Sequence, residues 1–221
     1  MTSLTHDQLA QRIAADIPEG AYVNLGIGLP TLIANYLPSD KDIFLHSENG
    51  LLGMGAYPKA EAIDPDLINA GKEPVTLLAG GAFFHHGDSF AMMRGGHLDI
   101  CVLGAYQVSA CGDLANWSTG NPQAIPAVGG AMDLATGAKK VYVMTNHLTR
   151  DGQSKIVEHC TFPLTGLGCI DRIYSDLAVM EVTDQGLVVT EILADISAQS
   201  LQEVTPVPLS FQLSAEEVTH G

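Results

Sequence analysis

Basic residues are scarce in this sequence. Its 221 residues include 10 lysines and arginines against 25 aspartates and glutamates, a formal net charge of −15, and no lysine or arginine follows Arg172. A chain this acidic repels the phosphates of nucleic acids, so direct nucleic-acid binding is excluded as a main function. Charged residues of both signs make up only 16% of the chain, below the usual value of about a quarter. This composition favours a soluble protein that covers part of its surface with a partner.

Paired cysteines, long apolar runs and a secretory leader are also missing. The four cysteines form no C-x-x-C pair and have no histidine at zinc-finger spacing, so we expect free thiols and no metal site. No segment reaches the roughly 18 apolar residues that span a bilayer. The first residues lack the basic-then-apolar order of a signal peptide. These absences predict a cytoplasmic protein without a membrane segment.

The spacing of hydrophobic residues predicts a single α/β domain over residues 1–221. Apolar residues recur every four positions between Thr5 and Ile17, which indicates an amphipathic helix with a capping box at Thr5 and Gln8. Short apolar runs then alternate with helical segments, a pattern typical of a mostly parallel open sheet flanked by helices. We expect strands at 22–25, 75–78, 100–103 and 141–144, helices at 30–36, 89–93 and 131–135, and a hairpin of 177–182 with 187–192. From about residue 197 to 221 we expect a helix and then a partly disordered tail.

Four glycine-rich turns follow or precede these elements, at residues 26–28, 50–55, 80–81 and 129–130. A single turn of this kind indicates only a tight change of direction. Ligands of parallel sheets bind beyond the carboxyl ends of the strands, so four such turns predict a rim where the backbone approaches a ligand. The segment from Gly26 to Gly28 does not extend into a dinucleotide motif, because Thr31 occupies the place of the third glycine.

Glu48 stands out among the acidic residues. It follows an apolar strand and has no lysine or arginine near it in the sequence. Composition alone favours a surface-loop acid at such a position. His85 and His86 are adjacent, so their side chains diverge and do not form a metal site unaided. A structural role and a contact with substrate or partner both remain open for these histidines.

Several segments together resemble one enzyme family, the 3-oxoacid coenzyme A (CoA) transferases, and specifically their B subunit. The segment SENGLLGMG (47–55) is similar to the SENG signature of that family. Further family-like segments follow in order: DLINAGK (66–72), SFAMMRGGHLDICVLGAYQVS (89–109), GDLANW (112–117), VGGAMDLATGAKK (128–140) and CTFPLTG (160–166). The resemblance covers roughly residues 8–195 and implies a NagB/RpiA-like fold. Within the family, the chain is more similar to the branch that uses 3-oxoadipate than to the branch that uses acetoacetate.

The resemblance implies a transfer of CoA from succinyl-CoA to a 3-oxo acid through a thioester on Glu48. The backbone N–H of Gly130 matches the family's oxyanion-stabilising donor. The resemblance and the glycine pattern offer Gly26, Gly28, Lys72 and Gly129 as contacts for substrate or CoA, and Asn49 as the residue that orients the Glu48 loop. Arg94 is a candidate for a substrate carboxylate or for a structural ion pair.

The resemblance also implies a separate A subunit in an A2B2 heterotetramer, without which this chain is inactive. No permanently bound cofactor is expected, because CoA enters as part of the substrate. Three alternatives remain open: the same reaction with acetoacetate or a short-chain acid as acceptor, an acyl-CoA thioesterase, and a non-catalytic ligand-sensing domain of the same fold.

Overall fold

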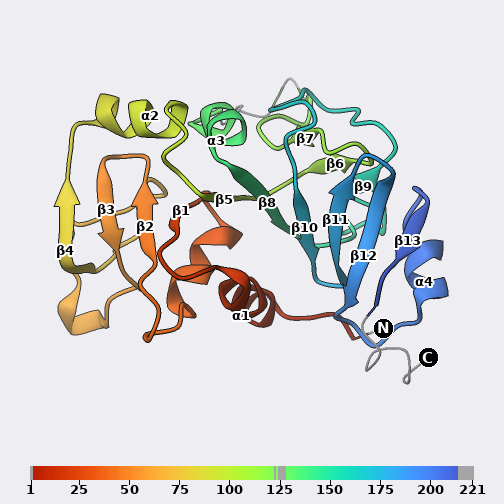
Figure 1. The fold of residues 1–221 in the computed structure, drawn as a ribbon, viewed down its shortest axis with the longest axis horizontal. Coiled ribbons are helices and arrows are strands. Elements are labelled where there is room, and N and C mark those ends of the chain that lie inside the picture. Colours follow the sequence, from red (N-terminus) through yellow and green to blue (C-terminus); the bar gives the residue numbers. More distant parts are fainter. Residues whose placement is uncertain (1, 122, 124–127, 214–221) are drawn as a thin grey trace.

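A ten-stranded mixed sheet dominates the computed structural model, which describes residues 2–121, 123 and 128–213 (Figure 1). Its strands are β1 (Tyr22–Leu25), β2 (Phe44–Ser47), β3 (Leu51–Met54), β4 (Leu77–Phe83), β5 (Ile100–Leu103), β8 (Lys140–Thr145), β10 (Arg172–Ser175), β11 (Ala178–Thr183), β12 (Gly186–Ile192) and β13 (Leu209–Phe211). The central strands are parallel in the order β2-β1-β5-β8-β10. Antiparallel strands extend both sides of this centre. The predicted class, a mostly parallel open sheet flanked by helices, is confirmed.

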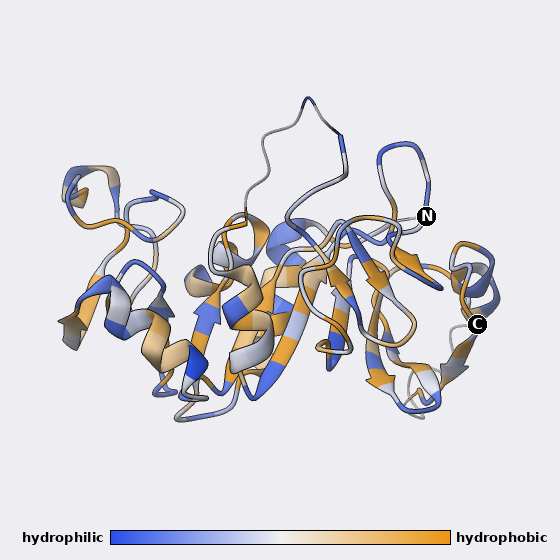
Figure 2. Cartoon of the chain, turned by 90° about the horizontal axis from the view of Figure 1, so that it is seen from above, coloured by the Kyte–Doolittle hydropathy of each residue, from blue (hydrophilic) through white to orange (hydrophobic). Residues whose placement is uncertain are grey.

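Helices cover both faces of the sheet. Helix α1 (His6–Asp16) and the 3-10 helix η1 (Leu29–Asn35) pack on one face, and α2 (His86–Arg94) and α3 (Ala131–Gly137) lie side by side on the other (Figure 1). Successive strand residues point to opposite faces. In β5, Cys101 and Leu103 therefore join the core under α2 and α3, whereas Ile100 and Val102 join the core under α1. Figure 2 shows hydrophobic residues concentrated on the central strands.

A second, three-stranded sheet lies beside the main one. Its strands are β6 (Gln107–Ser109), β7 (Leu114–Ala115) and β9 (Ile156–Val157), in the order β7-β6-β9. The parallel pairing of β6 with β9 brings the chain around residue 155 next to the segment that follows β5. A short 3-10 helix, η2 (Ala60–Ala62), precedes β4, and α4 (Ala198–Glu203) precedes β13. The predicted disordered end falls on residues 214–221, which lie outside the described residues.

The capping box of α1 is present as predicted. The Thr5 hydroxyl accepts the backbone N–H of Gln8 at 3.2 Å, and the Gln8 side chain accepts the backbone N–H of Thr5 at 2.9 Å. Leu9, Ile13 and Ile17 are fully buried. The apolar positions that predicted the helix are therefore the ones that attach it to the sheet.

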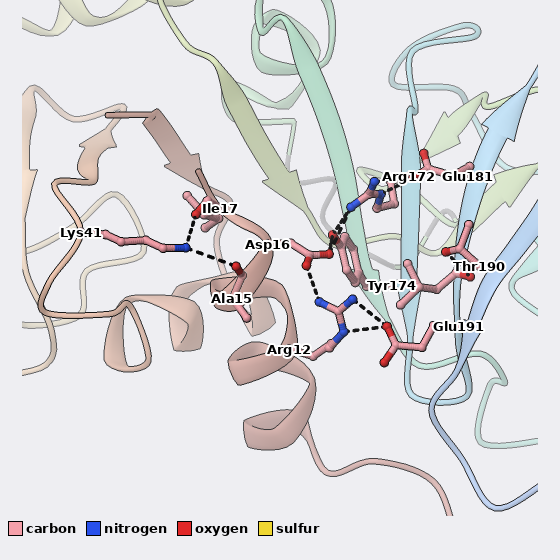
Figure 3. Close-up of polar contacts among 11 residues, drawn as sticks. Arg12, Ala15, Asp16, Ile17, Lys41, Arg172, Tyr174, Glu181, Thr190 and Glu191 are labelled. Carbon is pink, nitrogen blue, oxygen red and sulfur yellow. Dashed lines mark hydrogen bonds and ion pairs between the residues drawn. The ribbon is translucent and has the colours of Figure 1, made fainter. Parts of the chain in front are cut away.

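Charged residues join α1 to strands β10, β11 and β12 (Figure 3). Arg12 forms ion pairs with Asp16 at 2.5 Å and with Glu191 at 2.6 Å. Arg172 pairs with Glu181 and, at 3.1 Å, with Asp16, which also accepts the Tyr174 hydroxyl at 2.7 Å. Burial alone raises the pKa of Asp16, but its hydrogen bonds and the two arginines lower it overall. The resulting ionised network lies away from the carboxyl ends of the central strands and serves the fold.

Two of the predicted turns were wrong. Residues 80–81 lie inside strand β4, and residues 51–54 of the predicted 50–55 turn form strand β3. Gly81 allows close packing of β4 on β3, because a Cβ there would lie 3.0 Å from the Leu52 carbonyl oxygen. The segment after Gly28 forms a 3-10 helix, and Pro30 lies in its first turn as predicted. The other predicted strands and helices are present within a few residues of the expected bounds.

Candidate active site

Glu48 lies in the tight turn between β2 and β3. The turn is closed by a hydrogen bond from the Gly50 N–H to the Ser47 carbonyl at 3.0 Å. Gly50 has a φ of 108°, and a Cβ there would overlap the carbonyl oxygen of Phe84. Only glycine is therefore compatible with this turn, which holds Glu48 at the carboxyl end of a central strand.

A buried histidine, His46, supports the turn at the end of β2. His46 is 1% exposed, and its ring nitrogens contact the Asn24 amide and the Ser89 hydroxyl, both at 2.9 Å. Burial lowers the pKa of His46 to about 4, so the imidazole is neutral at physiological pH. Because both ring nitrogens have partners, His46 fixes the end of β2 without adding charge beside Glu48.

The Glu48 carboxylate is partly buried against the start of α3. Burial raises its pKa, while a hydrogen bond from the backbone N–H of Gly130 lowers it. The charge of His86 also lowers the pKa and that of Asp133 raises it, and the net effect is a rise. A Cβ on Gly130 would overlap Glu48 Oε2, so the close approach of carboxylate and backbone requires glycine. A half-buried carboxylate that lies against a backbone N–H is well placed to act as a nucleophile.

A cavity of about 380 Å³ opens beside Glu48. It lies at the carboxyl ends of β1, β5 and β8, where ligands of parallel sheets bind. Four predicted residues line it together, namely Glu48, Gly26, Gly129 and Gly130. Gly26 packs so tightly against β5 that a Cβ would lie 3.0 Å from the Val102 carbonyl oxygen. The predicted glycine rim is therefore present at 26 and 129–130, whereas residues 50–55 and 80–81 do not line the cavity.

Three predicted residues do not line this cavity. Gly28, with a φ of 95°, starts η1, and the Asn49 amide donates to the Ile68 carbonyl at 2.8 Å. The exposed Lys72 has a φ of 66° and closes a turn by its N–H to the Asn69 carbonyl at 2.9 Å. Ala70 in the same turn does line the cavity, and its N–H donates to the Ser47 hydroxyl at 3.0 Å. Lys72 thus lies two residues from the cavity lining, and Asn49 anchors the Glu48 turn.

The other residues noted in the sequence surround α2. His85 caps the helix, since its Nδ1 accepts the N–H of Gly87 at 3.0 Å. His86 stacks on Phe90 with ring centroids 4.8 Å apart. Arg94 pairs with Asp133 at 2.6 Å, which favours the structural alternative for this residue.

Sequence reasoning missed the polar residues on the far side of the cavity. Thr145, Asn116 and Lys155 all line it. The Lys155 ammonium donates to the Thr145 hydroxyl at 3.0 Å and to the Ala105 carbonyl at 3.3 Å. No local motif marks Lys155, because the pairing of β9 with β6 brings it to the cavity. Within the described residues, no three metal-ligating side chains gather in a group, and no helix has the length and apolar character to cross a membrane.

Known proteins of similar sequence and structure agree with this arrangement. A family model described as coenzyme A transferase matches residues 6–201. The B subunit of 3-oxoadipate CoA-transferase from Pseudomonas putida is 68% identical over 93% of this chain and 96% of that protein. The B subunit of succinyl-CoA:3-ketoacid coenzyme A transferase from Helicobacter pylori is 46% identical over 94% of this chain and 99% of that protein.

Structural similarity extends to more distant proteins. An acyl-CoA transferase apoenzyme from Escherichia coli O157:H7 has a TM-score of 0.74 at 19% identity, and the match covers 96% of this chain but 44% of that one. At that identity the match shows the fold alone. The family model and the sequence relatives together establish that this chain belongs to the coenzyme A transferase family, which confirms the resemblance drawn from its sequence.

Proposed function

We propose that this chain is the B subunit of a two-chain transferase that moves CoA between carboxylic acids, with Glu48 as the nucleophile. One observation carries the proposal: the Glu48 carboxylate is partly buried at the cavity and lies directly against the backbone of Gly130. Membership of the CoA transferase family supports it. A carboxylate suits this reaction because its acyl anhydride is reactive enough to exchange with a thioester.

The proposed reaction has two half-reactions. Glu48 attacks the thioester carbonyl of succinyl-CoA, the carbon–sulfur bond breaks, and a mixed anhydride and CoA thiolate form. The thiolate then attacks the glutamyl carbonyl and expels succinate, which leaves CoA as a thioester on Glu48. The acceptor carboxylate runs both steps in reverse, so the kinetics are ping-pong.

Gly130 has a specific part in this scheme. Attack of the thiolate on the glutamyl carbonyl places negative charge on a Glu48 oxygen. Gly130 lies directly against this carboxylate, and its N–H is therefore the candidate donor for that charge. One such donor typically contributes a factor of about 10²–10³ in kcat.

The preferred acceptor is 3-oxoadipate. The 68% identity to the B subunit of a 3-oxoadipate CoA-transferase supports this choice over the 3-ketoacid enzyme at 46%. Both relatives are named as B subunits, which supports a separate A subunit for this chain as well, and the A2B2 stoichiometry stays a prediction. The cytoplasmic location and the lack of a permanently bound cofactor are likewise predictions. Because this chain carries a net charge of −15, we expect much of the positive charge that meets the CoA phosphates to come from the A subunit.

Rates with the two-chain enzyme test the proposal. Succinyl-CoA is supplied with 3-oxoadipate, with acetoacetate or with no acceptor, and transfer is followed as loss of succinyl-CoA and gain of the new thioester. We expect transfer to be fastest with 3-oxoadipate. Release of free CoA without an acceptor would identify a thioesterase instead, and binding without turnover would identify a sensing domain.

A further inference from the structure

Lys155 is held firmly at the cavity. Its backbone N–H donates to the His147 carbonyl at 2.9 Å, and its carbonyl accepts the N–H of Val108 at 2.9 Å. Its ammonium donates to the Ala105 carbonyl and to the Thr145 hydroxyl, which itself donates to the Ala105 carbonyl at 3.3 Å. These contacts place the charge where β5 and β8 end. An ammonium has three N–H donors, so one is left for the cavity.

The positive charge of Lys155 is not neutralised by an ion pair. In the described part of the chain, its ammonium forms no salt bridge with any carboxylate. Burial lowers its pKa, and the charge of Asp176 opposes this effect. An ammonium that is partly dehydrated and unpaired is costly unless an anion joins it during function. Neither Arg94, which is paired with Asp133, nor the exposed Lys72 offers such a charge inside the cavity.

The separation between Glu48 and Lys155 matches a short dicarboxylic acid. Glu48 follows β2, whereas the contacts of Lys155 follow β5 and β8. Neighbouring strands lie about 4.8 Å apart, so two to three spacings, roughly 10–14 Å, separate the two groups. Succinyl and 3-oxoadipyl chains contain three to five carbon–carbon bonds of about 1.5 Å each. Because these bonds zigzag, the extended chain is about 4–6 Å long, and with a contact of about 3 Å at each end it spans roughly 10–12 Å, the lower part of this range.

We propose that Lys155 selects dicarboxylic substrates by binding the carboxylate remote from the reacting carbonyl. This inference rests on the proposed function and adds a specificity-determining residue to it. While Glu48 attacks one end of the acid, the ammonium holds the other end in place. Thr145 and the Ala105 carbonyl orient the ammonium and do not neutralise it. Acids with a methyl group in place of the second carboxylate leave the charge unpaired and are disfavoured.

The test compares two four-carbon donors, succinyl-CoA and butyryl-CoA, with the assembled two-chain enzyme. The readout is kcat/KM for formation of the Glu48–CoA thioester from each donor. We expect Lys155→Met to lower the succinyl-to-butyryl ratio by about 10- to 100-fold, mainly through the succinyl-CoA value, as is typical for loss of a charge-assisted hydrogen bond. Lys155→Arg keeps the charge and should retain most of the ratio.

Matched variants separate the possible outcomes. Lys139→Met removes an exposed lysine that pairs with Asp99 outside the cavity, and it should change neither rate. Equal loss with both donors in Lys155→Met would show a structural role and overturn the inference. Should that variant unfold, Lys155→Gln repeats the comparison with a neutral side chain that keeps an N–H donor. Failure of the unaltered enzyme to form any thioester would overturn the proposed function itself.

Discussion

Arg12, Asp16 and Arg172 lie between α1 and the sheet with each charge paired (Figure 3). Glu48 and Lys155, in contrast, line the cavity and have no ion pair among the described residues. Both groups are partly buried. In the network, burial opposes ionisation and the partners outweigh it, so the pKa of Asp16 is lowered. At the cavity, burial dominates: the pKa of Glu48 is raised and that of Lys155 is lowered.

This difference indicates what each region does. Paired charges stabilise the fold, and because each already has a partner they would gain little interaction energy from a ligand. Unpaired, partly dehydrated charges reduce stability and gain most when a substrate arrives. The comparison leads to four predictions, in order of decreasing effect.

Glu48→Gln should separate catalytic activity from stability most strongly. Loss of the nucleophile is expected to lower turnover by more than about 10⁴-fold. Because the folded-state pKa of Glu48 is raised, its ionised form costs stability above its unfolded pKa, and a neutral amide removes that cost at pH 7. We expect the Tm to rise by about 1–3 °C. Calorimetry and rate measurements on one preparation check both effects. An inactive variant with an unchanged or lower Tm would contradict the claim that the ionised Glu48 carboxylate reduces stability.

Gly130→Ala should lower kcat by about 10²–10³-fold, the usual effect of removing an oxyanion donor. The added Cβ would overlap Glu48 Oε2 and force the carboxylate away from the N–H. Gly104→Ala is the matched control, because Gly104 lines the same cavity, its φ is not positive and a Cβ there meets nothing within 4 Å. Steady-state kinetics of both variants should show a clearly larger loss at position 130, and equal losses would argue against the special role of its N–H.

Asp16→Asn should weaken the fold and leave the chemistry alone. Removing one partner of this network is expected to cost about 1–3 kcal/mol of unfolding free energy, measured by urea titration. The folded-state pKa of Asp16 is lowered, so its contribution is present above the unfolded pKa and is lost as the pH falls. The variant should therefore show a flatter loss of stability on acidification. For comparison, breaking the exposed Lys139–Asp99 pair should cost less than about 1 kcal/mol of unfolding free energy. A large change in turnover in Asp16→Asn would contradict the distinction between the paired network and the cavity.

Asp133→Asn should give the smallest effect, a change in pH dependence. The charge of Asp133 raises the pKa of Glu48, so its removal should move the acid limb of kcat/KM to lower pH. His86→Gln should move the limb to higher pH, because the charge of His86 lowers the same pKa. Opposite shifts in the two pH profiles are the expected result, and parallel shifts would show that another group controls the limb.

Local patterns in the sequence predicted much of the fold. The Thr5 capping box and the four-residue repeat to Ile17 describe α1 because both depend only on neighbouring residues. Buried central strands such as 100–103 were recognised as short apolar runs. Strand β4 was misplaced because Gly80 and Gly81 were interpreted as a turn, whereas the strand continues through them to Phe83.

The candidate site was only partly predictable. Glu48 and Gly130 came from a family resemblance, and composition alone would have placed Glu48 on a surface loop. Their contact depends on the packing of α3 against the β2–β3 turn. Lys155 carried no signal at all, because a sheet pairing between segments about fifty residues apart brings it to Ala105.

Detection of CoA on Glu48 tests the central claim most directly. The assembled two-chain enzyme is incubated with succinyl-CoA and no acceptor, digested and measured by mass spectrometry. The peptide that contains Glu48 should gain the mass of CoA joined with loss of water, and the gain should disappear in Glu48→Gln and after addition of 3-oxoadipate. Full transferase turnover with no adduct on Glu48, or with an adduct on another residue, would contradict the account.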